Sequence, residues 1–97
     1  MTTKLTDAQR AEQLTPLFQA GWALVEDRDA ISKTYVFSNF VTAFQWMTGV
    51  AIEAEILGHH PEWSNVYRTV DVVLTTHDTG GLSELDVALA TRMDAMA

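Results

Sequence analysis

The three histidines of the chain, His59, His60 and His77, are its strongest candidates for chemistry. Imidazole changes its charge near neutral pH, so a histidine can donate or accept a proton under physiological conditions. Glu55 precedes His59 by four residues, a spacing that brings two side chains together on one face of a helix. These residues therefore predict a site for acid–base chemistry in which Glu55 orients the His59 ring.

Two other interpretations of the same residues are open. Imidazoles beside a carboxylate can bind zinc or ferrous iron, but neighbouring side chains outside a helix diverge, so His59 and His60 are poorly placed to share one ion. The chain contains no cysteine, which excludes disulfides, thiolate metal sites and cysteine nucleophiles. We therefore predict no metal. Alternatively, the two adjacent histidines are exposed residues at a helix end without a catalytic role.

The composition of the chain bounds its class. With 97 residues, of which 47% are apolar and 20% charged, we expect a single domain over residues 1–97. The net charge of −7 disfavours binding to nucleic acid or to an anionic membrane. The most apolar stretch, residues 40–57, is interrupted by polar side chains, which indicates a core helix rather than a membrane span. The polar first residues lack the apolar run of a signal peptide, so we expect a cytoplasmic protein.

The first third of the chain predicts a helix and a hairpin. Thr6 and Gln9 have the spacing of a capping box, and apolar residues then recur every three or four positions. Pro16 lies inside this pattern and should kink or shorten the last turn. Residues 22–26 and 30–37 are rich in aromatic and β-branched side chains, and a polar turn separates them. They predict two antiparallel strands.

The remainder predicts a long helix, a strand and a last helix. Apolar positions over residues 40–58 trace one helical face. Over residues 65–76 most odd positions are polar, and the even positions are apolar at Val66, Val70, Val72 and Leu74, with Arg68 breaking the pattern. This alternation predicts one long half-buried strand with His77 on the uncovered side. Ser83 and Asp86 have capping-box spacing and should begin the terminal helix, where Asp86 has no further role to perform.

The order of these elements, α-β-β-α-β-α, predicts an α+β fold. Two adjacent antiparallel strands cannot start a doubly wound parallel sheet, so a two-layer sandwich with helices on one face of an antiparallel sheet is the economical arrangement. The uncovered face and the free edges of such a sheet need shielding, most simply by a second copy of the chain. We therefore expect a homodimer or a homotetramer.

Residues 55–67, together with residues 76–78 and the turn at 80–83, resemble the signature of the pterin-4a-carbinolamine dehydratases. The shared pattern is an acid, three residues, His-His-Pro, an aromatic residue a few positions later, and a further histidine before a glycine-containing turn and the last helix. The resemblance extends upstream to Gly21 and is weakest in the first twenty residues. Gly58 departs from it, because relatives often carry a polar or acidic residue there.

The resemblance implies a fold and an activity. The fold is an α+β sandwich whose sheet extends across a dimer, in agreement with the order of elements above. The activity is loss of water from 4a-hydroxytetrahydropterin to give quinonoid dihydropterin after an aromatic amino acid hydroxylase has turned over. The pterin is then the substrate, and no separate cofactor is implied. Some relatives instead act as dimerisation cofactors of a transcription factor or as assembly modules, which is the alternative function.

The resemblance also assigns roles within the site. His59 and His60 would flank the C4a hydroxyl as candidate acids, and His77 would assist removal of the proton from N5, although which histidine is acid and which is base stays open. Glu55 would hold His59 or contact the edge of the pterin, and Pro61 would shape the wall. The remaining substrate contacts would come from backbone groups of Thr76, His77, Asp78 and Thr79.

Overall fold

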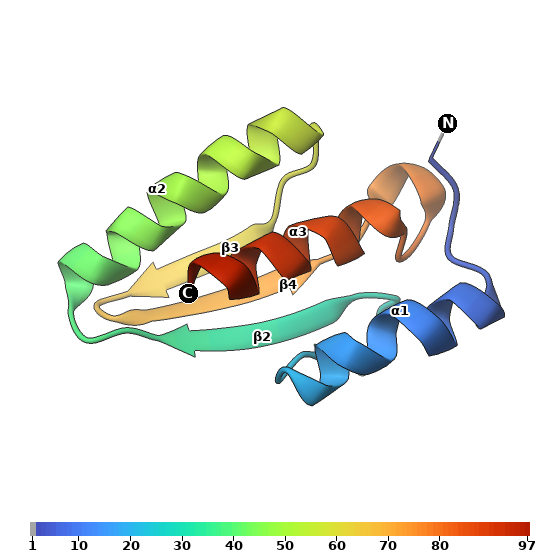
Figure 1. Ribbon diagram of the computed structural model, residues 1–97, viewed down its shortest axis with the longest axis horizontal. Helices are drawn as coiled ribbons and strands as arrows, with labels where there is room; N and C mark the ends of the chain where they lie inside the picture. The colour runs from blue at the N-terminus through green and yellow to red at the C-terminus, as the bar shows by residue number, and fades with distance from the viewer. Residues whose placement is uncertain (1) are drawn as a thin grey trace.

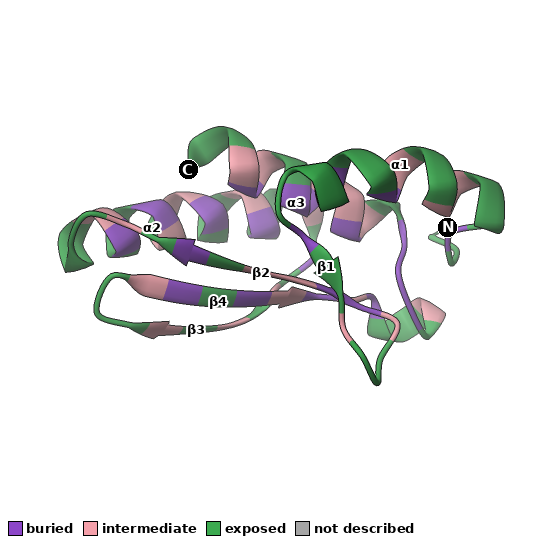
Figure 2. Ribbon diagram, turned by 90° about the horizontal axis from the view of Figure 1, so that it is seen from below, coloured by how far each residue is buried: buried purple, intermediate pink, exposed green. Residues whose placement is uncertain are grey.

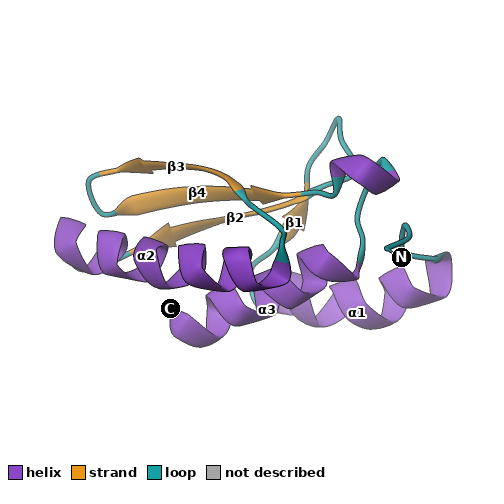
Figure 3. Cartoon of the chain, turned by 90° about the horizontal axis from the view of Figure 1, so that it is seen from above, coloured by secondary structure: helices purple, strands orange, loops and turns teal. Residues whose placement is uncertain are grey.

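Three helices cover one face of a four-stranded antiparallel sheet (Figures 1 and 3). The computed structural model describes residues 2–97. Its elements are α1 (Asp7–Gln19), β1 (Ala23–Leu24), β2 (Ile31–Val36), α2 (Phe40–Leu57), β3 (Glu62–Val66), β4 (Thr69–Leu74), the 3-10 turn η1 (His77–Thr79) and α3 (Glu84–Met96). The strands lie in the order β1-β2-β4-β3. The predicted α+β sandwich with helices on one face is confirmed.

The predicted single strand over residues 65–76 is wrong, because the chain reverses within it. β3 and β4 form a hairpin in which Val66 pairs with Thr69, so the order of elements is α-β-β-α-β-β-α. Tyr67 adopts a left-handed φ of 53°, and the Asn65 side chain donates to the carbonyl oxygens of Tyr67 (3.1 Å) and Thr69 (3.0 Å). The turn contains no glycine or proline, and the apolar even positions Val66 and Val70 lie on either side of it, with only Arg68 interrupting the alternation. The period of two therefore concealed the turn.

The reversal also changes which face Val66 occupies. On β4 the even positions Val70, Val72 and Leu74 are buried beneath the helices, as predicted. Val66 belongs to β3 instead, pairs with Thr69 on the uncovered face and is 75% exposed. Figure 2 shows the buried residues gathered between the sheet and the helices.

The helix boundaries follow the local signals in the sequence. Thr6 and Gln9 form the predicted capping box, and α1 continues past Pro16 to Gln19. The predicted hairpin is confirmed, although β1 pairs with β2 over only two residues. The second helix ends at Gly58, whose φ of 64° is in the left-handed region that favours glycine. The chain therefore leaves α2 in a new direction immediately before the two adjacent histidines.

Asp94 on α3 joins three elements beside the core. Its carboxylate accepts hydrogen bonds from Trp22 Nε1 (3.0 Å), from Lys33 Nζ (2.7 Å) and from the Tyr35 hydroxyl. Burial, assisted by the hydrogen bond to Asp94, raises the pKa of Tyr35 above its usual value. The Lys33 ammonium also donates to the Ala20 carbonyl oxygen at the end of α1 (2.7 Å). This cluster fixes α3 against β2 and the end of α1.

Within residues 2–97, no helix combines the length and the apolar character needed to cross a membrane.

We expect Asp94→Ala to lower the free energy of unfolding by about 2 kcal/mol, because three donors lose their shared acceptor in a partly buried position. Chemical denaturation monitored by circular dichroism measures the change. Asp27→Ala is the matched control, since Asp27 is exposed in the turn before β2 and its loss should cost no more than about 0.5 kcal/mol. Equal losses for the two variants would contradict the role of Asp94.

Candidate active site

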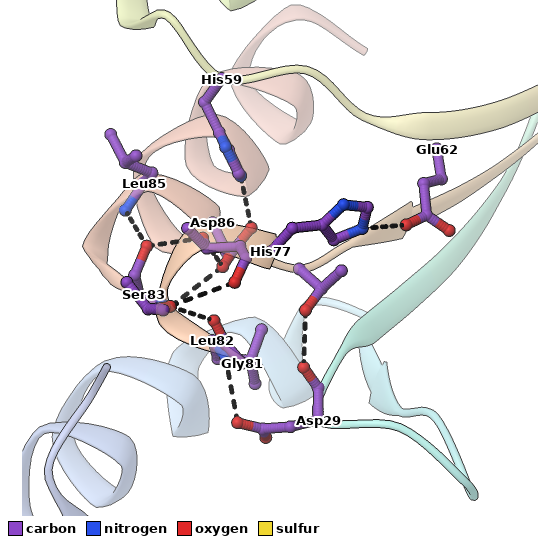
Figure 4. Close-up of polar contacts among 12 residues, drawn as sticks. Asp29, His59, Glu62, His77, Gly81, Leu82, Ser83, Leu85 and Asp86 are labelled. Atoms are coloured by element: carbon purple, nitrogen blue, oxygen red, sulfur yellow. Dashed lines mark hydrogen bonds and ion pairs between the residues drawn. The ribbon is translucent and has the colours of Figure 1, made fainter. Parts of the chain in front are cut away.

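A pocket of about 300 Å³ lies where the end of α2, the start of β3, the η1 segment and the start of α3 meet (Figure 4). It contains the predicted site residues His59, His60, Thr76, His77 and Asp78. The other residues that line it are Gly58, Glu62, Thr75 and Leu85. The structure therefore brings the three histidines to one pocket from two segments far apart in sequence. Glu55, Pro61 and Thr79 are not among the lining residues.

His59 is the buried histidine of the pocket. Only 8% of the residue is exposed, and its Nε2 lies 2.5 Å from Oδ1 of Asp86 (Figure 4). The predicted contact between Glu55 and His59 is wrong. The four-residue spacing brings side chains together only within a helix, and α2 ends at Leu57, so the left-handed Gly58 turns His59 away from the helical face that carries Glu55.

Asp86 has more partners than the predicted capping role requires. The capping box with Ser83 is confirmed: Oδ2 of Asp86 accepts from the Ser83 backbone N–H (3.0 Å). The same oxygen also accepts from the Thr76 hydroxyl (2.7 Å), and Thr76 Oγ1 lies 2.7 Å from Ser83 Oγ. With Oδ2 occupied in this way, Oδ1 is left for His59. A carboxylate only accepts, so we assign the ring proton of His59 to Nε2. The Thr76 side chain thereby links the pocket wall, which it lines, to Asp86.

His60 has the partner that was predicted for its neighbour. Its Nε2 lies 2.6 Å from Oε1 of Glu55, and 63% of the His60 side chain is exposed. Glu55 therefore contacts an imidazole of the site from outside the pocket lining. The turn at Gly58 places His60, rather than His59, beside the last turn of α2, and Glu55 therefore pairs with His60.

His77 lines the pocket from η1. Its side chain is 76% exposed, and its Nε2 lies 3.0 Å from Oε2 of Glu62 on β3 (Figure 4). The Arg28 guanidinium donates to both oxygens of the same carboxylate, each at 2.8 Å. Hydrogen bonds from Arg28 and His77 lower the pKa of Glu62 to about 2. The same pairing raises the pKa of Arg28.

Sequence reasoning missed Glu62, Arg28 and Asp86 as members of this constellation. Glu62 follows the His-His-Pro run directly, so its position was a usable signal. Arg28 lies 34 residues upstream of Glu62, and no local pattern connects the two. The spacing of Asp86 from Ser83 was fully explained by helix capping, so nothing in the sequence indicated its contact with His59.

The loop that carries His77 is held by Asp29. The Asp29 carboxylate accepts from the Leu82 backbone N–H (3.0 Å), and its carbonyl oxygen accepts from the Thr75 hydroxyl (2.9 Å). A Cβ at Gly81 would approach the Asp29 carboxylate to 2.1 Å, so only glycine fits there. The Thr79 hydroxyl donates to two carbonyl oxygens inside the same loop. Thr79 thus stabilises the segment that presents His77.

The arrangement supplies several proton donors and acceptors around one small cavity. His60 and His77 stand exposed at its mouth, each against a carboxylate, and His59 is fixed in its wall. Such a set suits a reaction in which one group is protonated while another loses a proton. Across residues 2–97, His, Asp and Glu side chains do not gather in any group of three that could hold a metal ion.

Residues 3–96 match the protein family described as pterin 4 alpha carbinolamine dehydratase. A protein of Dinoroseobacter shibae, whose name places it in the same family, is 62% identical over the full length of both chains. The pterin-4-alpha-carbinolamine dehydratase of Drosophila melanogaster is 54% identical over the whole of this chain, which spans 50% of that protein.

Two solved structures resemble the fold. The crystal structure of a transcriptional coactivator/pterin dehydratase from Brucella melitensis has a TM-score of 0.91 at 44% identity, covering 98% of this chain and 99% of that one. A pterin dehydratase-like protein described as a RuBisCO assembly factor in the alpha-carboxysome has a TM-score of 0.68 at 23% identity, covering 79% of this chain and 89% of that one. The second likeness shows the fold alone.

We expect Asp86→Ala to lower the free energy of unfolding by about 3 kcal/mol, because it leaves buried partners on three segments without their acceptor. Denaturant titration measures the loss. Glu84→Ala is the control, since Glu84 is an exposed acid in the same first turn of α3 and should contribute no more than about 1 kcal/mol through the helix dipole. Similar values for both variants would show that Asp86 is only a helix-terminal charge.

Proposed function

The chain belongs to the pterin 4 alpha carbinolamine dehydratase family, and we propose that it removes water from a 4a-hydroxytetrahydropterin in the pocket formed by His59, His60 and His77. The convergence of three imidazoles on one cavity carries this proposal. A volume of about 300 Å³ lies at the lower end of the range for small-molecule sites, which suits a bicyclic heterocycle whose side chain extends into solvent.

The reaction needs one proton donor and one proton acceptor. Protonation of the C4a hydroxyl lets the carbon–oxygen bond break, and water leaves with the bonding electron pair. The proton on N5 is removed, and the electron pair of the N–H bond becomes the second bond between N5 and C4a. The product is the quinonoid dihydropterin, and neither oxidation nor reduction occurs. General acid–base catalysis of this kind is work that imidazoles perform near neutral pH.

The two steps are assigned as the resemblance to the dehydratase family implies. His77 takes the N5 proton, and His59 and His60 are the candidate acids for the hydroxyl. His59 has only Nδ1 left for the substrate, because Nε2 is bonded to Asp86, so it can act as the acid only when the ring is doubly protonated and Nδ1 also carries a proton. Glu55 acts on His60, in place of its predicted partner.

Substrate binding completes the proposed assignment. Backbone groups of residues 76–79 bond the heterocycle, while Pro61, which follows the histidine pair directly, shapes the chain beside the pocket wall. We also propose that the pterin is a substrate and that no cofactor is needed. The physiological source of the substrate would be an aromatic amino acid hydroxylase, and the location of the reaction in the cytoplasm stays a prediction.

A second function has one observation in its favour. The Brucella melitensis relative is described as both a transcriptional coactivator and a pterin dehydratase. A non-catalytic role as a dimerisation cofactor or assembly module would use the outer surface of the protein and would leave the histidines dispensable. Substitution of the histidines therefore separates the two functions.

We propose that the chain assembles into a homodimer or a homotetramer. β3 is an edge strand, and edge strands present unpaired backbone groups to further strands. Helix α2 also presents an apolar outer face, whose exposed side chains are Phe40, Val41, Phe44, Ile52 and Ile56. A second copy of the chain, with the same apolar face, is the partner that these surfaces fit.

We expect His60→Ala and His77→Ala each to lower the rate of quinonoid dihydropterin formation about a hundredfold, because each removes a positioned acid or base. Stopped-flow absorbance with synthetic 4a-hydroxytetrahydropterin measures the rate. Both side chains are exposed, so the unfolding midpoint should stay unchanged and serves as the control. A double variant with the wild-type rate would refute the assignment. Activity that a chelator abolishes and zinc restores would contradict the absence of a metal.

We expect light scattering at micromolar concentration to give a mass of at least twice 10.8 kDa, with an unfolding midpoint that rises with protein concentration. Phe44→Glu should reduce the mass if α2 forms an interface, because it places a charge in the apolar face. Thr91→Glu, on an exposed position of α3, is the matched control and should leave the mass unchanged. A monomer at every concentration would contradict the proposed assembly.

A further inference from the structure

A chain of polar contacts runs from the β1–β2 loop to the pocket through Arg28, Glu62 and His77. Arg28 Nη1 and Nη2 each donate to one oxygen of Glu62, at 2.8 Å. Oε2 of Glu62, which accepts one of these bonds, is also the atom that faces Nε2 of His77 at 3.0 Å. The three residues come from three segments: the β1–β2 loop, β3 and η1. Arg28 lies outside the pocket lining and is connected to His77 through Glu62.

The bidentate contact with Arg28 fixes the orientation of the Glu62 carboxylate. A guanidinium that donates to both oxygens fixes the plane of the carboxylate as well as its position. The Glu62 side chain is 42% exposed, so little packing would otherwise hold it in one rotamer. Arg28 is thus the group that aims Oε2 of Glu62 at the ring of His77.

The position of Arg28 is itself secured by its neighbour. Asp29 accepts from the Thr75 hydroxyl through its carbonyl oxygen and from the Leu82 N–H through its carboxylate. It also pairs with Arg10 on α1 at 2.9 Å. These bonds attach the β1–β2 loop to residues on both sides of the η1 segment. The distance between Arg28 and the His77 backbone is therefore set by the fold.

We propose that Arg28 is a positioning residue for the dehydration: by fixing Glu62 it holds the His77 ring with Nε2–H directed at Glu62 and Nδ1 free to accept the substrate proton. The inference rests on the proposed function, in which His77 acts on N5. Its basis is the geometry of the three side chains. The pKa of Glu62, lowered to about 2 by its hydrogen bonds with Arg28 and His77, agrees with a carboxylate that accepts from both groups.

The charged surroundings of His77 come from several elements. Glu62 on β3 contacts its ring, with Arg28 of the β1–β2 loop behind it. Asp78 is its neighbour in the chain, and His59 and His60 line the same pocket from the segment after α2. Within this set, Glu62 is the group whose contact determines the ring nitrogen that carries the proton.

The first test compares two partly exposed arginines that each pair with a glutamate, of which only Glu62 contacts a histidine of the pocket. Arg28→Gln should lower kcat about tenfold and leave KM nearly unchanged, because the ring of His77 loses its orientation while the substrate contacts remain. Arg92→Gln is the matched control: Arg92 pairs with Glu53 at 3.0 Å, its side chain is 39% exposed against 42% for Arg28, and it lies outside the pocket lining. Its kcat should equal that of the wild type. Arg28→Lys keeps the charge without the fork and should recover only part of the rate.

The second test asks whether Arg28 acts through His77. In a His77→Ala background, Arg28→Gln should cause no further loss of kcat, because the group that it positions is gone. Independent losses that multiply would overturn the inference, as would an Arg28→Gln variant that retains full kcat or changes only KM.

The third test needs no activity. Carbon-13 NMR of the Glu62 carboxyl should give a pKa near 2 in the wild type and a higher pKa, shifted toward the usual value of 4.5, in Arg28→Gln, because the largest of the contributions that lower it is lost. An equal Glu62 pKa in the wild type and in Arg28→Gln would show that the Arg28–Glu62 pair does not form in solution, and would overturn the inference. A wild type without dehydratase activity would refute the proposed function and this role with it. Wild-type activity together with a fully active Arg28→Gln variant would refute this inference alone.

Discussion

The buried carboxylate of Asp86 joins the three segments that form the pocket. It accepts hydrogen bonds at the start of α3, from the segment after β4 through Thr76 and from the segment after α2 through His59. A carboxylate without exposure to solvent is stable only when its oxygens are satisfied, so each of these segments depends on the other two. Helix capping and the wall of the pocket therefore depend on the same residue: Asp86, in the first turn of α3, completes the capping box and also holds His59.

The three histidines differ in how the fold restrains them. His59 is held in the protein interior by Asp86. His60 and His77 are exposed and pair with the surface carboxylates of Glu55 and Glu62, respectively. Exposed ion pairs contribute little to stability, because solvent screens them and side-chain entropy opposes them. These pairs orient side chains instead: each carboxylate fixes the orientation of one exposed imidazole of the pocket. The pocket thus combines one buried imidazole with two that are exposed to solvent.

Pairing across the sheet brings these restraints to one place. The antiparallel register sets Glu62 opposite Val73, two residues before Thr75, so β3 delivers its first side chain beside the segment that carries His77. The reversal at Tyr67 makes this possible, since a single straight strand would have carried residues 62–66 away from the pocket. The hairpin that the alternation of apolar residues concealed is therefore part of the site as well as of the fold.

The sequence by itself determined the features that act over a few residues. The caps at Thr6 and Ser83, the end of α2 at Gly58 and the α+β class follow from local hydrogen bonding and from periodicity, and the histidine motif indicated the chemistry. Only the tertiary structure decided which carboxylate each histidine contacts. His59 and Asp86 are 27 residues apart, a separation for which no local pattern exists. The partners of the imidazoles depend on how the chain turns after Gly58 and Tyr67, because a single left-handed residue redirects every side chain that follows it.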